Sequence, residues 1–244
     1  MRRSMSAKST EASRVRRFRF RYKETIATIL AESEEVFKKA VELMLYAREK
    51  IEEKISRDPF FSITYSPYDC SEEIVERMCR ASKLAGVGPM AAVAGTIAGY
   101  AVEKVEADFV VVDNGGDIAL KTDRELLVGI YPTNLAFKIE PTDFLAICTS
   151  SGKIGHSVSF GYADAATVIA KDASVADAFA TALGNIVGEK DGKKEIEEKI
   201  EEFWKKAKSY VEGLLVVKDE VVAFAGKIPE LVVAKIDPDV ITKG

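Results

Sequence analysis

Asp177 and Thr181 are the residues whose types and spacing most directly suggest chemistry. They stand four positions apart in the segment VADAFATALGNIVG, so on a helix both side chains emerge from one face, one turn apart. A carboxylate and a hydroxyl on an alanine-lined face suit a hard cation such as magnesium, which takes oxygen ligands and shares them with phosphate. The alternative is that Asp177 is a carboxylate near a helix start, where the helix dipole favours it.

The stretch Phe109–Leu120, FVVVDNGGDIAL, carries an apolar strand into a polar turn. Its first four residues have strong β preference and predict a strand covered on both faces. Gly115 and Gly116 permit positive φ and leave room for a flat or anionic ligand to approach the backbone. Neighbouring side chains, Asn114 and Asp117 among them, offer oxygens for turns, a metal or hydroxyl groups. An Asn-Gly hairpin turn is the alternative.

A second polar segment follows another apolar strand. Thr149 and Ser150 lie in CTSSG, and His156, the only histidine, comes just beyond. A histidine in a loop can act as a general acid or base, or donate a hydrogen bond to a phosphate oxygen. Most isolated histidines do neither, so a purely structural role is the alternative.

The helices and strands that position these groups are predicted from the spacing of apolar residues, which recur at helical intervals or at every second position. Arg17–Glu24 alternates aromatic and basic residues and predicts a half-exposed strand, with Thr25–Ala31 as its hairpin partner. Ser33 caps a helix that runs to about Arg57. Gly88-Pro89 opens a helix whose face of Ala and Gly residues suits either a flat ligand or tight packing. Further segments are assigned as follows: PFFSITYSPYD as strand and loop, a helix capped by Ser71 that ends near Ala85, a strand at 165–170, a helix at 195–213, and a hairpin at 213–226 that turns at 218–220.

Composition sets the class of protein. With 244 residues and 47% hydrophobic residues the chain can bury a large core. A net charge of −4 argues against a nucleic-acid partner. We expect no signal peptide, because the basic N-terminal segment has no apolar core of the length that one needs, and no membrane span, because no apolar run is long enough. Three cysteines without CxxC spacing predict neither a disulfide framework nor a zinc site, so we expect a reduced, cytoplasmic protein. Residues 1–13 are expected to be a disordered tail and residues 14–244 one domain.

Four motifs come in a specific order: GTIAGYAVE, VVVDNGGDI, CTSSG with GHS, and ATVIAKDASVADAFATAL. Together they resemble the ApbE superfamily, the FAD:protein FMN transferases, over residues 95–183. Within it, the chain is most similar to a small cytoplasmic branch without an assigned reaction. The resemblance implies an α+β, T-fold-related architecture of mixed sheets with packed helices in a single compact unit.

The resemblance also implies a site. Magnesium would be held by Asp177, Thr181 and the backbone carbonyl of Ala94, with His156 as the catalytic residue beside the diphosphate. The residues implied to contact the flavin nucleotide, FAD, are Gly95, Gly99, Asn114, Gly115, Gly116, Thr149 and Ser150. The implied reaction transfers FMN to a hydroxyl group of an acceptor protein.

Two departures from the family pattern leave alternatives open. Ala98 stands where the transferases usually carry a charged residue, and SVSFGYAD follows the histidine where they have Asp-Pro and Thr-Gly. One alternative is a different enzyme in the same pocket, weakly linked by the resemblance to sulfur assimilation towards homocysteine, which would need Cys148. Another is a non-catalytic binding or assembly module, with a homo-oligomer formed through the strand that carries Phe18, Phe20 and Tyr22.

Overall fold

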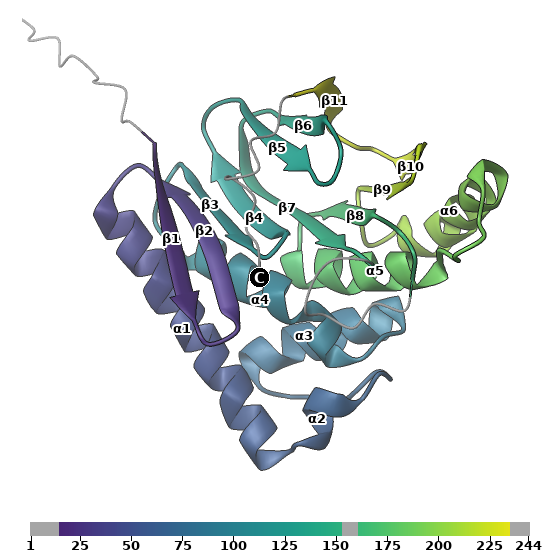
Figure 1. Cartoon of the computed structure of the whole chain (residues 1–244). Helices are drawn as coiled ribbons and strands as arrows, with labels where there is room; N and C mark the ends of the chain where they lie inside the picture. The colour runs from purple at the N-terminus through teal and green to yellow at the C-terminus, as the bar shows by residue number, and fades with distance from the viewer. Residues whose placement is uncertain (1–14, 153–160, 235–244) are drawn as a thin grey trace, which may run out of the picture.

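An eight-stranded antiparallel sheet runs through the computed structural model, which describes residues 15–152 and 161–234 (Figure 1). In spatial order its strands are β1 (Arg16–Tyr22), β2 (Thr25–Ala31), β3 (Val110–Asn114), β4 (Asp117–Thr122), β7 (Thr142–Ser150), β8 (Ala165–Ala170), β9 (Gly213–Lys218) and β10 (Val221–Gly226). A second, three-stranded sheet has the order β11 (Glu230–Val233), β6 (Leu135–Ile139) and β5 (Leu126–Ile130). All pairs between the described strands are antiparallel, whereas the prediction was of mixed sheets.

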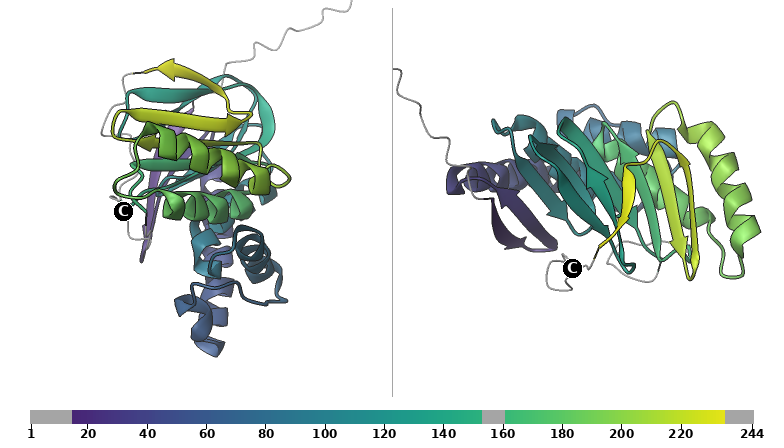
Figure 2. Two further views of the ribbon diagram at one scale, coloured as in Figure 1. Left: turned by 90° about the vertical axis from the view of Figure 1, so that its right-hand side faces the viewer. Right: turned by 90° about the horizontal axis from the view of Figure 1, so that it is seen from above.

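The helices cover one face of the large sheet and the small sheet covers the other (Figures 1 and 2). They are α1 (Glu34–Arg57), α2 (Phe60–Ile63), α3 (Glu73–Ala85), the 3-10 helix η1 (Pro89–Ala92), α4 (Val93–Lys104), α5 (Ala173–Ile186) and α6 (Lys193–Ala207). Successive side chains of a strand point to opposite faces. Val110 and Val112 of β3 therefore join the core under the helices, whereas Val111 joins the core under the small sheet. The predicted α+β unit with packed helices is confirmed.

Several predicted elements are present at their expected positions. The β1–β2 hairpin, the 165–170 strand and the β9–β10 hairpin all form. Ser33 caps α1, because its hydroxyl accepts a hydrogen bond from the Val36 amide at 3.2 Å. The aromatic face of β1 is turned inward, where Phe18 stacks on Phe37 with ring centroids 4.3 Å apart. That face therefore packs on α1, and the homo-oligomer through this strand stays a prediction.

Three local predictions were wrong. The segment predicted as a strand after residue 58 forms the single turn α2 and a loop, because Pro59 lies at helical dihedrals and starts a turn. Helix α3 is preceded by Glu72 as its N-cap, one position after Ser71. Pro89 begins η1, and α4 starts only at Val93. The tail predicted over residues 1–13 falls outside the described residues.

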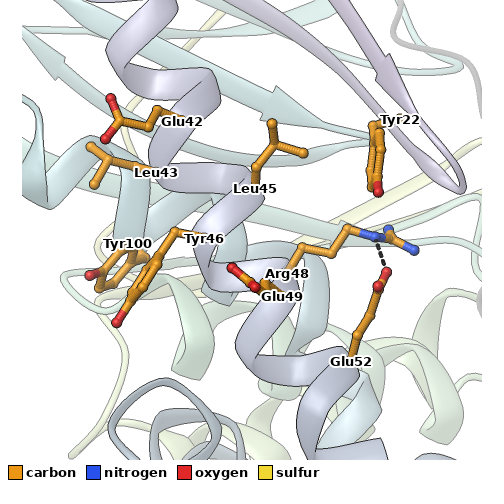
Figure 3. Close-up of a pocket in the computed structure, with 9 residues that line it drawn as sticks. All are labelled: Tyr22, Glu42, Leu43, Leu45, Tyr46, Arg48, Glu49, Glu52 and Tyr100. Atoms are coloured by element: carbon orange, nitrogen blue, oxygen red, sulfur yellow. Dashed lines mark hydrogen bonds and ion pairs between the residues drawn. The ribbon is translucent and has the colours of Figure 1, made fainter. Parts of the chain in front are cut away.

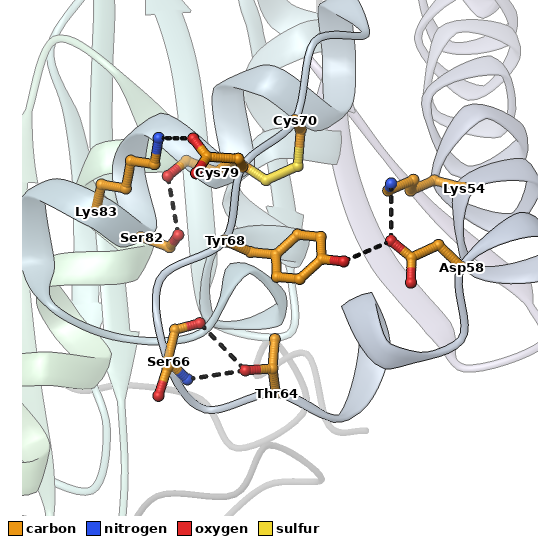
Figure 4. The surroundings of a disulfide bond; sticks show 10 residues. Lys54, Asp58, Thr64, Ser66, Tyr68, Cys70, Cys79, Ser82 and Lys83 are labelled. Carbon is orange, nitrogen blue, oxygen red and sulfur yellow. Dashed lines mark hydrogen bonds and ion pairs between the residues drawn. A yellow bond between two sulfur atoms is a disulfide. The ribbon is translucent and has the colours of Figure 1, made fainter.

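The cysteine prediction is also corrected. Cys70 and Cys79 form a disulfide with Cα atoms 5.9 Å apart (Figure 4). It ties the loop before α3 to that helix, and Tyr68 in the same loop donates a hydrogen bond to Asp58 at 2.8 Å. The spacing did not predict the pair, because the two cysteines are nine residues apart and do not form a CxxC pattern. Cys148 remains a free, buried thiol.

No single helix in the described part of the chain is long and apolar enough to cross a membrane. Residues Glu73–Ala85 and Pro89–Lys104 meet the length and composition requirement only as a pair, and the pair is bent by 105°.

Candidate functional site

Asp177 of α5 reaches the N-terminus of α4. Its Oδ2 accepts a hydrogen bond from the Gly95 amide at 2.7 Å in a buried position. Helix α4 has no side-chain cap of its own, so Asp177 satisfies amides that the helix start leaves open. This corrects the alternative reading of Asp177, since the helix it caps is α4 and not its own. Burial raises the pKa of Asp177 to about 7, while hydrogen bonds from the Gly95 and Ala94 amides oppose that rise.

The glycine-containing face of α4 packs directly on α5. A Cβ added to Gly95 would lie 2.4 Å from the carbonyl oxygen of Ala173 and 2.6 Å from Cβ of Asp177. A Cβ added to Gly99 would lie 2.7 Å from Cβ of Ala173. Such distances are well inside van der Waals contact, so α5 fills this face. This face therefore shows the close packing that the sequence left open as the alternative, with a helix as the partner, while contact of Gly95 and Gly99 with a cofactor stays a prediction.

Gly115 and Gly116 form the two-residue turn of a hairpin. Asn114 pairs with Asp117 across it, and the glycines have φ of 73° and 102°. Positive φ at both central residues is what this kind of tight hairpin needs, and glycine adopts it without a steric penalty. The hairpin alternative is thus correct. It leaves Gly115 accessible, since this residue is exposed with no atom within 4 Å of an added Cβ, whereas Gly116 is half-buried.

The residues that close this hairpin point towards the helices. Directly opposed residues of an antiparallel pair point to the same face. The Asn114 side chain donates a hydrogen bond to the Ala94 carbonyl at 3.1 Å. Beside it, Oδ1 of Asp117 is buried and has no hydrogen-bond partner among the described residues. The turn therefore carries one satisfied and one unsatisfied polar group to the start of α4.

Asp117 is electrostatically unfavourable as a carboxylate. Burial, followed by the nearby charges of Asp177 and Asp113, holds its pKa well above the ordinary range. The Thr149 amide and the neighbouring Cys148 side chain act in the opposite direction. Two buried acidic groups thus interact with each other across the junction of β4 and α5, where an added positive charge would be stabilised.

Cys148 lies opposite Asp117 in the pairing of β4 with β7. It is fully buried, and its thiol donates a hydrogen bond to the Ala173 carbonyl at 3.6 Å. Burial, together with the charges of Asp117 and Asp177, raises its pKa well above the usual value for a thiol. The nucleophile in cysteine chemistry is the thiolate. This environment therefore argues against the alternative enzyme that needs Cys148.

The TSSG segment divides between the two faces of the sheet. The Thr149 hydroxyl lies 2.9 Å from the hydroxyl of Thr167, on the face covered by the small sheet. Ser150 is buried on the face that also carries Cys148. The structure thus brings Ser150, and not the side chain of Thr149, to the side of Asp177.

Thr181 lies one turn beyond Asp177 on α5 and is half-buried. His156 lies outside the described residues. Within the described ranges, no three His, Cys, Asp or Glu side chains are grouped so that they could hold a metal ion. Oxygen atoms available near the start of α4 are those of Asp177, the Ala94 carbonyl and Asp117. The sequence indicated that Asp117 offers an oxygen at the turn, but no role was predicted for it. The alternation of side chains along β4 could have placed it on the same face as Asn114.

A shallow groove of about 780 Å³ lies elsewhere, between α1, α4 and the β1–β2 hairpin (Figure 3). Its lining residues are Tyr22, Glu42, Leu43, Leu45, Tyr46, Arg48, Glu49, Glu52 and Tyr100. Arg48 already donates hydrogen bonds to Glu52 at 2.7 Å, to Thr25 at 2.6 Å and to Glu24. The groove contains none of the predicted site residues.

Comparison with known proteins agrees with the order of the motifs. The model of a family described as AbpE bacteria matches residues 7–215. A UPF0280 protein of Archaeoglobus fulgidus is 63% identical over 94% of this chain and all of its own length. A UPF0280 protein of Methanothrix thermoacetophila is 46% identical, covering 92% of this chain and 98% of its own.

Solved structures with the same fold include two ApbE proteins. The flavinyl transferase ApbE of Pseudomonas stutzeri superimposes with a TM-score of 0.59 at 12% identity, over 87% of this chain and 94% of its own. The ApbE protein of Thermotoga maritima gives a TM-score of 0.58 at 12% identity, over 95% and 100% of the two chains. At this level of identity the likeness concerns the fold.

Proposed function

The chain belongs to the AbpE bacteria family, and from that premise we propose that it binds magnesium and a flavin nucleotide, FAD, and transfers FMN to a hydroxyl group of an acceptor protein. The proposed site lies where the start of α4, the β3–β4 turn and α5 meet. The similarity in fold between this chain and a flavinyl transferase supports the choice of a flavin nucleotide as the ligand.

One observation carries the proposal: Asp177 is buried, and Oδ1 of the nearby, partly buried Asp117 is itself buried and has no hydrogen-bond partner among the described residues. Buried charges of the same sign are costly unless a cation or proton compensates them. A hard divalent cation prefers carboxylate and carbonyl oxygens, which are the donors present here. The donor set therefore fits magnesium.

Each residue then has a defined task. Asp177 and the Ala94 carbonyl would hold the cation, with Thr181 one turn further along α5. Asn114 keeps that carbonyl in place through its hydrogen bond. The exposed turn at Gly115 leaves the backbone open to a nucleotide. A bound magnesium ion supplies positive charge that neutralises a diphosphate and orients it for transfer.

The test is release of AMP from FAD by the purified protein in the presence of magnesium, measured by chromatography, with water in place of the acceptor hydroxyl as the nucleophile that takes the FMN group and gives free FMN. We expect AMP release that depends on magnesium and disappears in Asp177→Ala, whose circular dichroism must match the parent protein. Tight FAD binding without AMP would leave a flavin-binding protein and remove the transfer reaction. AMP release that is unchanged in Asp177→Ala would remove the site.

The alternative chemistry at Cys148 has its own test. Because the thiol is buried and hydrogen-bonded to Ala173, Cys148→Ala is expected to retain AMP release. Loss of activity in a folded Cys148→Ala protein would return the alternative enzyme to consideration.

A further inference from the structure

The unsatisfied oxygen of Asp117 is the starting point. Oδ1 of Asp117 is buried without a hydrogen-bond partner in the described part of the chain, although an unsatisfied buried acceptor costs about 1–3 kcal/mol. Whether this oxygen is charged or protonated, no group in the described residues hydrogen-bonds to it. Native structures keep such groups rarely, and usually where a ligand, ion or water completes them.

Three elements bring this oxygen to the start of α4. Asp117 closes the hairpin opposite Asn114, whose amide donates a hydrogen bond to the Ala94 carbonyl at 3.1 Å. It also lies opposite Cys148, whose thiol reaches the Ala173 carbonyl of α5 at 3.6 Å. One turn along α5, Asp177 accepts the hydrogen bond of the Gly95 amide with its Oδ2. Asn114, the partner of Asp117 across the turn, and Asp177 thus bond to adjacent residues of α4, Ala94 and Gly95.

We propose that Asp117 is a second carboxylate ligand of the divalent cation, so that the protein binds the cation without a nucleotide. A site with one carboxylate needs the phosphates of the nucleotide to balance the charge of the divalent cation, because Mg²⁺ commonly shares its coordination with substrate phosphate. Two carboxylates match the charge of a divalent cation by themselves. The inference rests on the proposed function for the location of the site, and it adds that cation binding precedes nucleotide binding.

The chain offers a matched control in the same turn. Asp113 stands four residues before Asp117, and its Oδ1 accepts a hydrogen bond from the Gly116 amide at 2.8 Å. It belongs to the opposite face of β3, paired with Ile118. Asp113→Asn removes a charge from the hairpin and retains that oxygen as an acceptor. Asp117→Asn removes the same charge from the proposed ligand.

The experiment is calorimetric titration of chelator-treated, nucleotide-free protein with MnCl₂, together with the electron paramagnetic resonance signal of Mn²⁺. We expect Asp113→Asn to bind Mn²⁺ slightly more weakly than the parent protein, because it removes a nearby negative charge, and Asp117→Asn to bind it at least about 10–100-fold more weakly, the loss seen even for residues that only support metal ligands. No binding by the parent protein without FAD, or equal binding by Asp117→Asn, would overturn the inference.

Thermal unfolding in chelator separates a ligand role from a structural one. Asp117→Asn is expected to unfold at the parent temperature or above it, since it removes a buried charge. A markedly lower temperature in the metal-free state would overturn the ligand role.

Quenching of FAD fluorescence, measured in parallel, separates this inference from the proposed function. Mn²⁺ binding that depends on Asp117 without any FAD binding supports the inference and contradicts the function. Magnesium-dependent FAD binding that is insensitive to Asp117→Asn does the reverse.

Discussion

At the scale of single residues, Asp177 makes the stability of the metal-free protein depend on pH. Its pKa is about 7 in the folded protein against an ordinary value of 3.8, so the folded state holds a proton that the unfolded state loses first. The free energy of unfolding therefore falls as pH rises from about 4 to 7 and levels off above. The loss is at most about 4 kcal/mol, since a tenfold change in a proton-binding constant is worth about 1.4 kcal/mol. Asp117 acts in the same direction, because its pKa is also raised.

Urea unfolding in chelator at pH 5 and pH 8 measures this effect. We expect greater stability at pH 5, and a smaller difference in Asp177→Asn, which has no proton to lose. Added magnesium should stabilise the protein more at pH 8 than at pH 5, because metal ligands must be deprotonated. Stability that is independent of pH in the parent protein would show that Asp177 titrates normally.

The three cysteines give a second prediction at this scale. Cys148 is buried with a raised pKa, and the other two form the disulfide. Ellman's reagent is therefore expected to find almost no reactive thiol in the native protein. In denaturant it should find one thiol per chain without reductant, and three after reduction, as the cysteine count requires. Three reactive thiols in unreduced, denatured protein would contradict the pairing of Cys70 with Cys79.

At the scale of elements, the contact between α4 and α5 depends on two glycines. In the interior of a helix, alanine is usually more favourable than glycine by about 1 kcal/mol. At Gly99 the new Cβ would lie 2.7 Å from Cβ of Ala173, so we expect Gly99→Ala to destabilise the protein by about 1–3 kcal/mol instead. Chemical denaturation of the variant measures this change.

A double-mutant cycle makes the glycine prediction specific. Ala173→Gly removes the opposing Cβ and should recover much of the loss in Gly99→Ala, with a coupling energy of at least about 1 kcal/mol. It should not rescue Gly95→Ala, whose Cβ meets the backbone carbonyl of Ala173 at 2.4 Å. Simple additivity at Gly99 and Ala173 would mean that the helices move apart at little cost.

The same contact shows what the sequence could and could not predict. The small-residue face of α4 was visible as a pattern, but sequence cannot say whether a ligand, a sheet or a helix covers such a face, because all three need small side chains. Ser33 and the β1–β2 hairpin were predictable because a cap and a hairpin are local. The pairing of Asp177 with the Gly95 amide depends on the tertiary fold, because 82 residues separate them, and the pairing of Cys70 with Cys79 depends on the path of the loop before α3.

At the scale of the whole molecule, the large sheet separates two cores. The core under the helices includes Cys148 and carries the site, whereas the core under the small sheet includes Phe137 and Ile139 of β6. Strand β6 lies in the middle of the small sheet, between β5 and β11. The small sheet therefore contributes to stability without contacting the ligands proposed for the cation.

Phe137 tests this division. It is 0% exposed, so Phe137→Ala should lower the free energy of unfolding by about 3–5 kcal/mol, the range for a buried phenylalanine. Phe224 of β10 is 58% exposed, and Phe224→Ala, the matched control, should change it by no more than about 0.5 kcal/mol. Where Phe137→Ala is still folded, its affinity for Mn²⁺ should equal that of the parent protein, since the sheet lies between Phe137 and Asp177. A loss of affinity in the folded variant would mean that the two cores are coupled through the strands, and that the site depends on the packing of the whole molecule.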